Sequence, residues 1–145
     1  MRELPRQLSA DELAGLFEGR TRFVELLAVR ENPLGVAPEV ARSLSDEEKK
    51  EVLDAHPPIG AKKLSARSAA EQGGGGDPAV LEELARLNRE YEEKFGFRFV
   101  VFVNRRLKSE ILPVLRERIG RTREQELDTA LDELVAIAED RWRKA

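Results

Sequence analysis

Signals for helix starts recur along the chain, and they constrain its fold more than any other feature. Segments 9–12, 45–48 and 122–125 each begin with Ser or Thr and end with Glu or Gln. This spacing is a capping box, in which the two side chains satisfy backbone N–H groups that the first helical turn leaves free. Apolar residues then recur at the period of a helix with one buried face. The sequence therefore predicts an all-α fold, a single-domain bundle of about seven or eight helices over residues 1–145.

The same signals give approximate limits for these elements. Helices are expected near 10–18, over 23–29, from 46 to about 56, in a short stretch from 65 or 68, over 78–95, over 109–119 and from 123 onward. Asn32-Pro33 is expected to stop the second of them, and Pro113 is expected near the first turn of the sixth. The glycines of segment 73–76 predict a flexible connector. Segment 97–103 is rich in aromatic and β-branched residues but has no second strand to pair with, so we expect one extended segment there.

Composition argues against several classes of function. Charged residues make up 37% of the chain, the net charge is −3, and acids and bases are interspersed, which argues against a nucleic-acid partner. No apolar run approaches the roughly 20 residues that span a membrane. We therefore expect a soluble, cytoplasmic protein with no membrane partner. The chain has no cysteine and one histidine, which excludes disulfides and thiolate catalysis and argues against a metal site built from these ligands.

The only histidine of the chain, His56, is the first candidate catalytic residue. It directly precedes Pro57 and is expected in the last turn of a helix, where exposed carbonyl groups favour the protonated imidazolium. Glu71 and Gln72 follow on the short helix predicted next. If the chain folds back between them, His56 and Glu71 form an acid and base pair. The alternative is that a histidine before a proline simply ends a helix.

Arg141 is the second unusual position. The last predicted helix carries one apolar stripe, and this arginine continues that stripe toward the end of the chain. A charge on a buried stripe is costly unless it meets an anion. The alternative is a solvated charge near a frayed helix end.

The sequence resembles the 2-oxo-4-hydroxy-4-carboxy-5-ureidoimidazoline (OHCU) decarboxylases, which act in the pathway from urate to allantoin. The resemblance covers about residues 8–143 and rests on His56-Pro57, Ser68-x-x-Glu71-Gln72, Leu87-Asn88, Tyr91 and Phe95-Gly96-Phe97-x-Phe99. It implies a cofactor-independent, metal-free lyase that converts OHCU to (S)-allantoin, and it implies a homodimer.

The resemblance also implies residue roles. His56 and Glu71 match the catalytic pair of the family, and the substrate-binding residues implied are Pro57, Ser68, Gln72, Phe97 and Arg141. Segment 97–103 is expected to wall the substrate pocket. The sequence His-Pro-Pro-Ile-Gly at 56–60 differs from the acidic loop common in the family, which leaves open that the same fold acts on another small cyclic carboxylic acid. A further alternative is a helical interaction module without activity, in which His56 merely ends a helix.

Overall fold

The computed structural model describes residues 3–57 and 77–144 of the chain, and this part contains seven α-helices and no strand. In chain order they are α1 (Ala10–Phe17), α2 (Arg22–Ala28), α3 (Pro33–Ser43), α4 (Asp46–Asp54), α6 (Pro78–Phe95), α7 (Lys108–Ile119) and α8 (Arg123–Lys144). The predicted all-α class is confirmed. The short helix predicted from 65 or 68 and the glycine connector at 73–76 lie outside the described residues.

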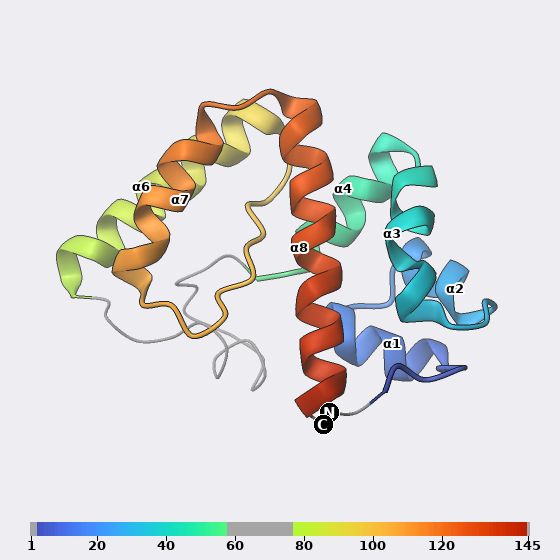
Figure 1. Cartoon of the computed structure of the whole chain (residues 1–145). Helices are drawn as coiled ribbons and strands as arrows, with labels where there is room; N and C mark the ends of the chain where they lie inside the picture. The colour runs from blue at the N-terminus through green and yellow to red at the C-terminus, as the bar shows by residue number, and fades with distance from the viewer. Residues whose placement is uncertain (1–2, 58–76, 145) are drawn as a thin grey trace.

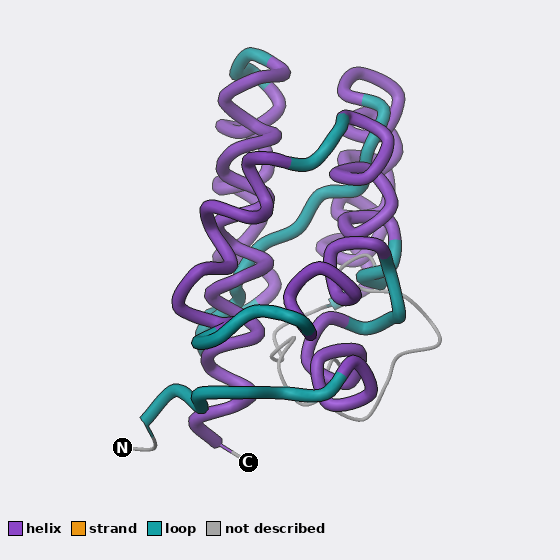
Figure 2. Tube along the Cα trace, turned by 90° about the vertical axis from the view of Figure 1, so that its right-hand side faces the viewer, coloured by secondary structure: helices purple, strands orange, loops and turns teal. Residues whose placement is uncertain are grey.

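Helix α8, the longest at 22 residues, runs through the middle of the molecule. Helices α1 to α4 lie on one side of it, and the hairpin of α6 and α7 lies on the other (Figure 1). The two ends of the described chain meet at one end of the molecule in both views (Figures 1 and 2). There the indole Nε1 of Trp142 donates to the carbonyl of Glu3 at 2.8 Å. None of the described helices is long and apolar enough to cross a membrane.

All three predicted capping boxes are confirmed. At α1 the Ser9 hydroxyl accepts from the Glu12 N–H at 3.1 Å, while the Glu12 carboxylate accepts from the Ser9 N–H at 3.0 Å. Equivalent reciprocal bonds open α4 and α8. Because each box satisfies orphan donors at a helix start, these three starts are fixed locally.

One expectation about prolines holds and another is wrong. Helix α2 ends at Ala28, before Asn32-Pro33, as expected. An unpredicted helix, α3, then begins at Pro33 itself. Proline suits that position, where its missing N–H has no helical partner anyway. Pro113 lies inside α7 and not near its first turn, so that expectation is wrong, and Pro38 lies inside α3. Each costs one helical hydrogen bond. Burial of the apolar faces of both helices outweighs this local cost.

Segment 97–103 is extended and buried without being a strand, as predicted. Side chains replace the missing partner strand. Arg118 Nη1 donates to the carbonyl of Val100 at 2.8 Å, and Arg106 donates to the carbonyls of Phe102 and Val103 at 2.6 and 3.0 Å. Because these buried backbone groups are paired, the segment can lie between the α6–α7 hairpin and α8 (Figure 1).

Candidate functional site

His56 lies just beyond the end of α4 and is buried, with 7% of its surface exposed. The side chain of Arg98, from the extended segment, fixes this turn. Its Nη1 donates to the carbonyls of Asp54 at 2.7 Å and His56 at 2.9 Å, and its backbone N–H donates to Asp54 Oδ1 at 3.1 Å. The guanidinium of Arg98 thus satisfies carbonyl groups at the end of α4. A positive charge is favourable there, because the C-terminal end of a helix carries a partial negative charge. The position of the imidazole therefore depends on a contact between α4 and the segment at 97–103.

Arg141 lies on the buried stripe of α8 and is 4% exposed. Its Nη2 is 2.9 Å from the carboxylate Oε1 of Glu18, and its Nη1 donates to the carbonyl of Leu16 at 3.0 Å. The expectation that a charge on this stripe must meet an anion is therefore confirmed. The alternative of a solvated charge at a frayed helix end is wrong, because α1 covers this part of α8.

His56, Arg141 and Glu18 act on one another electrostatically. Burial is the main cause that lowers the pKa of His56 from 6.5 to about 4, the positive charge of Arg141 lowers it further, and the negative charge of Glu18 raises it. The prediction that the end of α4 keeps this imidazole protonated near pH 7 is therefore wrong. Desolvation outweighs the helix end, and at pH 7 His56 is a neutral imidazole. Its Nδ1 has no hydrogen-bond partner among the described residues.

The other predicted site residues are placed only in part. Pro57 is half-buried next to His56. Phe97 is 1% exposed and packs its ring 5.9 Å from the rings of both Tyr91 and Phe95. Glu71, Ser68 and Gln72 lie outside the described residues. The fold thus places His56 within the electrostatic influence of Arg141, although the two residues are far apart in the sequence. The pairing of His56 with Glu71 stays a prediction.

Two residues of this region were not predicted from the sequence. Glu18 gives no signal beyond its place before the glycine that ends the first predicted helix. Arg98 gives a weak one, since it is the only charged residue in the apolar run at 97–103. Both act through contacts between segments far apart in the chain, which no local pattern reports.

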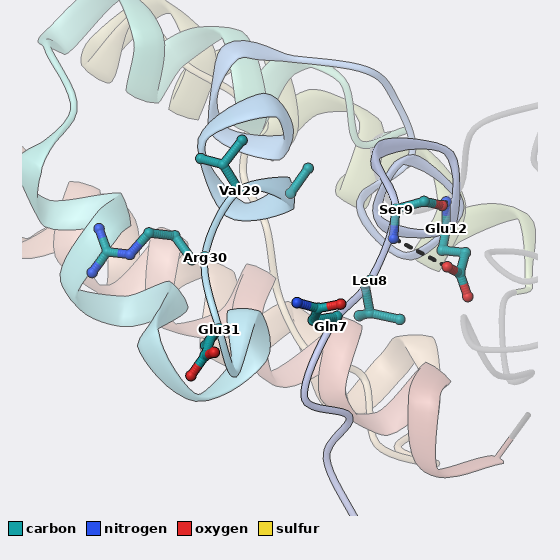
Figure 3. Close-up of a pocket in the computed structure, with 8 residues that line it drawn as sticks. Gln7, Leu8, Ser9, Glu12, Val29, Arg30 and Glu31 are labelled. Atoms are coloured by element: carbon teal, nitrogen blue, oxygen red, sulfur yellow. Dashed lines mark hydrogen bonds between the residues drawn. The ribbon is translucent and has the colours of Figure 1, made fainter.

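Two surface pockets in the described part of the chain are not lined by His56 or Arg141. One, of about 610 Å³, lies between the start of α1 and the end of α2 (Figure 3). Its polar groups include Ser9 and Glu12, which already bond to each other as a helix cap. A smaller one of about 290 Å³ is lined by residues that include Asp54, Phe97 and Arg98. None of the predicted catalytic residues lines either pocket.

Comparison with known proteins assigns the family. The model of the OHCU decarboxylase family matches residues 2–143, nearly the whole chain. The chain belongs to the OHCU decarboxylase family. His56 and Arg141 both lie within the matched range.

Relatives within this family cover the chain to different extents. The uric acid degradation bifunctional protein of Bacillus sp. (strain TB-90) is 32% identical over 105 residues, 69% of this chain and 21% of that protein. The 2-oxo-4-hydroxy-4-carboxy-5-ureidoimidazoline decarboxylase of Halalkalicoccus jeotgali is 34% identical over 99 residues, 65% of this chain and 56% of that protein. The matched part thus spans about a fifth and just over half of these two curated relatives.

Solved structures agree with the fold. A crystal structure of an OHCU decarboxylase in the presence of (S)-allantoin superposes with a TM-score of 0.76 at 24% identity, covering 92% of this chain and 96% of that one. A crystal structure of an (S)-allantoin synthase superposes with a TM-score of 0.67 at 27% identity, covering 91% of this chain and 47% of that one. The helical architecture is therefore that of the family.

Proposed function

We propose that the protein is a cofactor-independent carboxy-lyase that converts OHCU to (S)-allantoin in urate degradation. The observation that carries this proposal is the burial of His56 and of Arg141, whose positive charge acts on the imidazole, in a chain that the family model matches over residues 2–143. A neutral imidazole in the field of a fixed cation suits a small anionic substrate.

The reaction sets two tasks for these side chains. Loss of CO2 breaks a C–C bond and leaves its electron pair on the ring, which must be conjugated to receive it. The carboxylate has to be held out of the ring plane while the bond breaks, and a guanidinium holds direction as well as charge. Arg141 is the group for this task, with Ser68, Gln72, Pro57 and Phe97 proposed as the remaining binding residues.

The second task is proton transfer, because the carbon that receives the electron pair must gain a proton. A neutral His56 accepts a proton from the substrate hydroxyl, and the protein then returns a proton to one face of the ring. Glu71 is proposed as its partner in these steps. The lowered pKa keeps the imidazole neutral at pH 7, so a ring nitrogen is available to accept this proton.

An assay of the wild-type protein tests the activity. OHCU is generated in place by oxidising urate enzymatically, the protein is added, and circular dichroism follows the appearance of optically active allantoin. The proposal predicts faster product formation and an excess of the S enantiomer. Racemic allantoin at the uncatalysed rate would contradict it.

We also propose that the protein is a cytoplasmic homodimer, as the family resemblance implies. The monomer mass is 16.4 kDa, so a dimer has twice that mass. Light scattering behind a sizing column tests the proposal at the concentration used in the assay. A monomer mass there would contradict it.

A further inference from the structure

Glu18 occupies a backbone position that does not favour it. It follows the last residue of α1 as its C-cap and adopts the left-handed conformation, with φ at 65°. Glycine takes this conformation without strain, whereas a side chain with a Cβ does not. The next residue is Gly19, so the glycine lies one position after the left-handed residue. A strained residue of this kind motivates a search for its function.

The contacts of Glu18 supply a reason for its presence. Its carboxylate is 2.9 Å from Arg141 Nη2, and the two side chains are 14% and 2% exposed. The same guanidinium donates from Nη1 to the carbonyl of Leu16, two residues earlier in the chain. The end of α1 thus offers one charged and one neutral acceptor to two different nitrogens of Arg141. Two such bonds fix the plane of a guanidinium as well as its position.

The same corner of α1 also touches the turn that bears His56. A Cβ built on Gly19 would lie 3.4 Å from the Cβ of Ala55, so the two backbones approach closely there. Ala55 directly precedes His56. Helix α1, helix α8 and the end of α4 therefore meet around Glu18, and an acceptor at this point controls both the aim of Arg141 and the field at His56.

We infer that Glu18 is a positioning residue, which holds the Arg141 guanidinium in the direction that binds the substrate carboxylate beside His56. The inference rests on the proposed function for the nature of the substrate. Glu18 itself stays behind Arg141 and acts through it.

Steady-state kinetics on OHCU test this role with a matched pair of variants. Glu18→Gln keeps the size of the side chain and removes its charge. Asp11→Asn is the control, because it removes a carboxylate from α1 that forms an exposed ion pair. Its Oδ1 is also 2.9 Å from an arginine nitrogen, Nη1 of Arg20. Misaiming a binding group costs about 10- to 100-fold, and we expect that loss in kcat/KM for Glu18→Gln, mostly through KM. Asp11→Asn should stay within about twofold of wild type.

Two further variants separate positioning from a purely structural role. Glu18→Asp keeps the charge and tolerates the left-handed conformation. Its KM should therefore lie between those of Glu18→Gln and the wild type. Glu18→Gly relieves the backbone but removes the carboxylate, so it should fold and still show the raised KM. A Glu18→Gly enzyme with wild-type KM would overturn the inference, since Glu18 would then serve only to end the helix.

A readout without substrate keeps this test independent of the proposed function. His56 is the only histidine, so one imidazole signal in the NMR spectrum reports its titration. Removing the carboxylate of Glu18 should move that titration to lower pH, while Asp11→Asn should leave it in place. If the wild type does not convert OHCU, the proposed function fails, and this titration alone decides the coupling. An unchanged titration in Glu18→Gln, together with unchanged KM in an active enzyme, would overturn the inference.

Discussion

At the scale of single residues, the protonation of His56 is the property that the fold changes most. Burial and the charge of Arg141 lower its pKa from 6.5 to about 4. The unfolded chain therefore binds a proton at a pH where the folded chain does not. Where the unfolded state binds more protons, stability rises with pH, so acidification between about pH 6.5 and pH 4 penalises the folded state.

This difference predicts a measurable pH dependence. Between pH 8 and pH 5 the free energy of unfolding should fall by about 2 kcal/mol through His56 alone, since one pKa unit corresponds to about 1.4 kcal/mol. Urea unfolding of the wild type and of His56→Gln at both pH values isolates this part, because the other titrating groups are shared. The variant should lose less stability on acidification. Equal losses in the two proteins would show that the histidine keeps its ordinary pKa in the fold.

At the scale of elements, segment 97–103 connects the core to the site. It is buried like a strand, but arginine side chains satisfy its backbone, and Arg98 from the same segment holds the carbonyl of His56 at 2.9 Å. Helix α4 therefore ends in a defined way only when this segment is in place. A change at Arg98 should consequently disturb both stability and the position of the imidazole.

The variant Arg98→Gln tests this link. It removes the hydrogen bonds to the carbonyls of Asp54 and His56, and bonds to a charged group are worth about 1.5–3 kcal/mol each before relaxation. We expect a loss of about 1–3 kcal/mol in urea unfolding, with lower turnover of OHCU. Arg116→Gln is the control, because its partner Glu83 is 3.7 Å away in a more exposed pair. Similar unfolding midpoints for both variants would contradict the role of Arg98.

Much at this scale could be predicted from the sequence because the signals are local. The capping boxes at 9–12, 45–48 and 122–125 depend on residues within one turn, and all three occur as predicted. Helix α3 was missed because its prolines are helix-breaking signals, and only packing against α8 overrides them. In the candidate site, the resemblance predicts roles for His56 and Arg141, whereas the contacts of Glu18 and Arg98 join distant segments that no local pattern relates.

At the scale of the whole molecule, a buried ionic cluster joins the α6–α7 hairpin to α8. Glu126 at the start of α8 is fully buried and accepts from the Tyr91 hydroxyl at 2.6 Å, from Arg118 Nε at 2.7 Å and from Arg121 Nη1 at 2.9 Å. Arg118 also stacks 4.5 Å from the ring centre of Phe99. Because a buried charge without its partner is costly, this cluster should govern global stability.

The variant Glu126→Gln tests the cluster. Leaving Arg118 buried without its anion should cost about 3–5 kcal/mol, measured as the free energy of unfolding in urea. Asp132→Asn, which breaks the exposed pair with Arg42 at 3.0 Å on the same helix, should cost about 1 kcal/mol or less. A small effect of Glu126→Gln would show that the helices are held by apolar packing alone.

The central claim is that His56 and Arg141 work as one site, and a double-mutant cycle in turnover of OHCU measures this directly. His56→Gln and Arg141→Gln should each lower kcat/KM by about 100-fold or more, with Arg42→Gln as an exposed-arginine control. Groups that act as a unit give strongly non-additive losses. The kcat/KM of the double variant should therefore be only slightly lower than that of the less active single variant. Near-normal turnover in His56→Gln, or losses that simply multiply, would contradict the account.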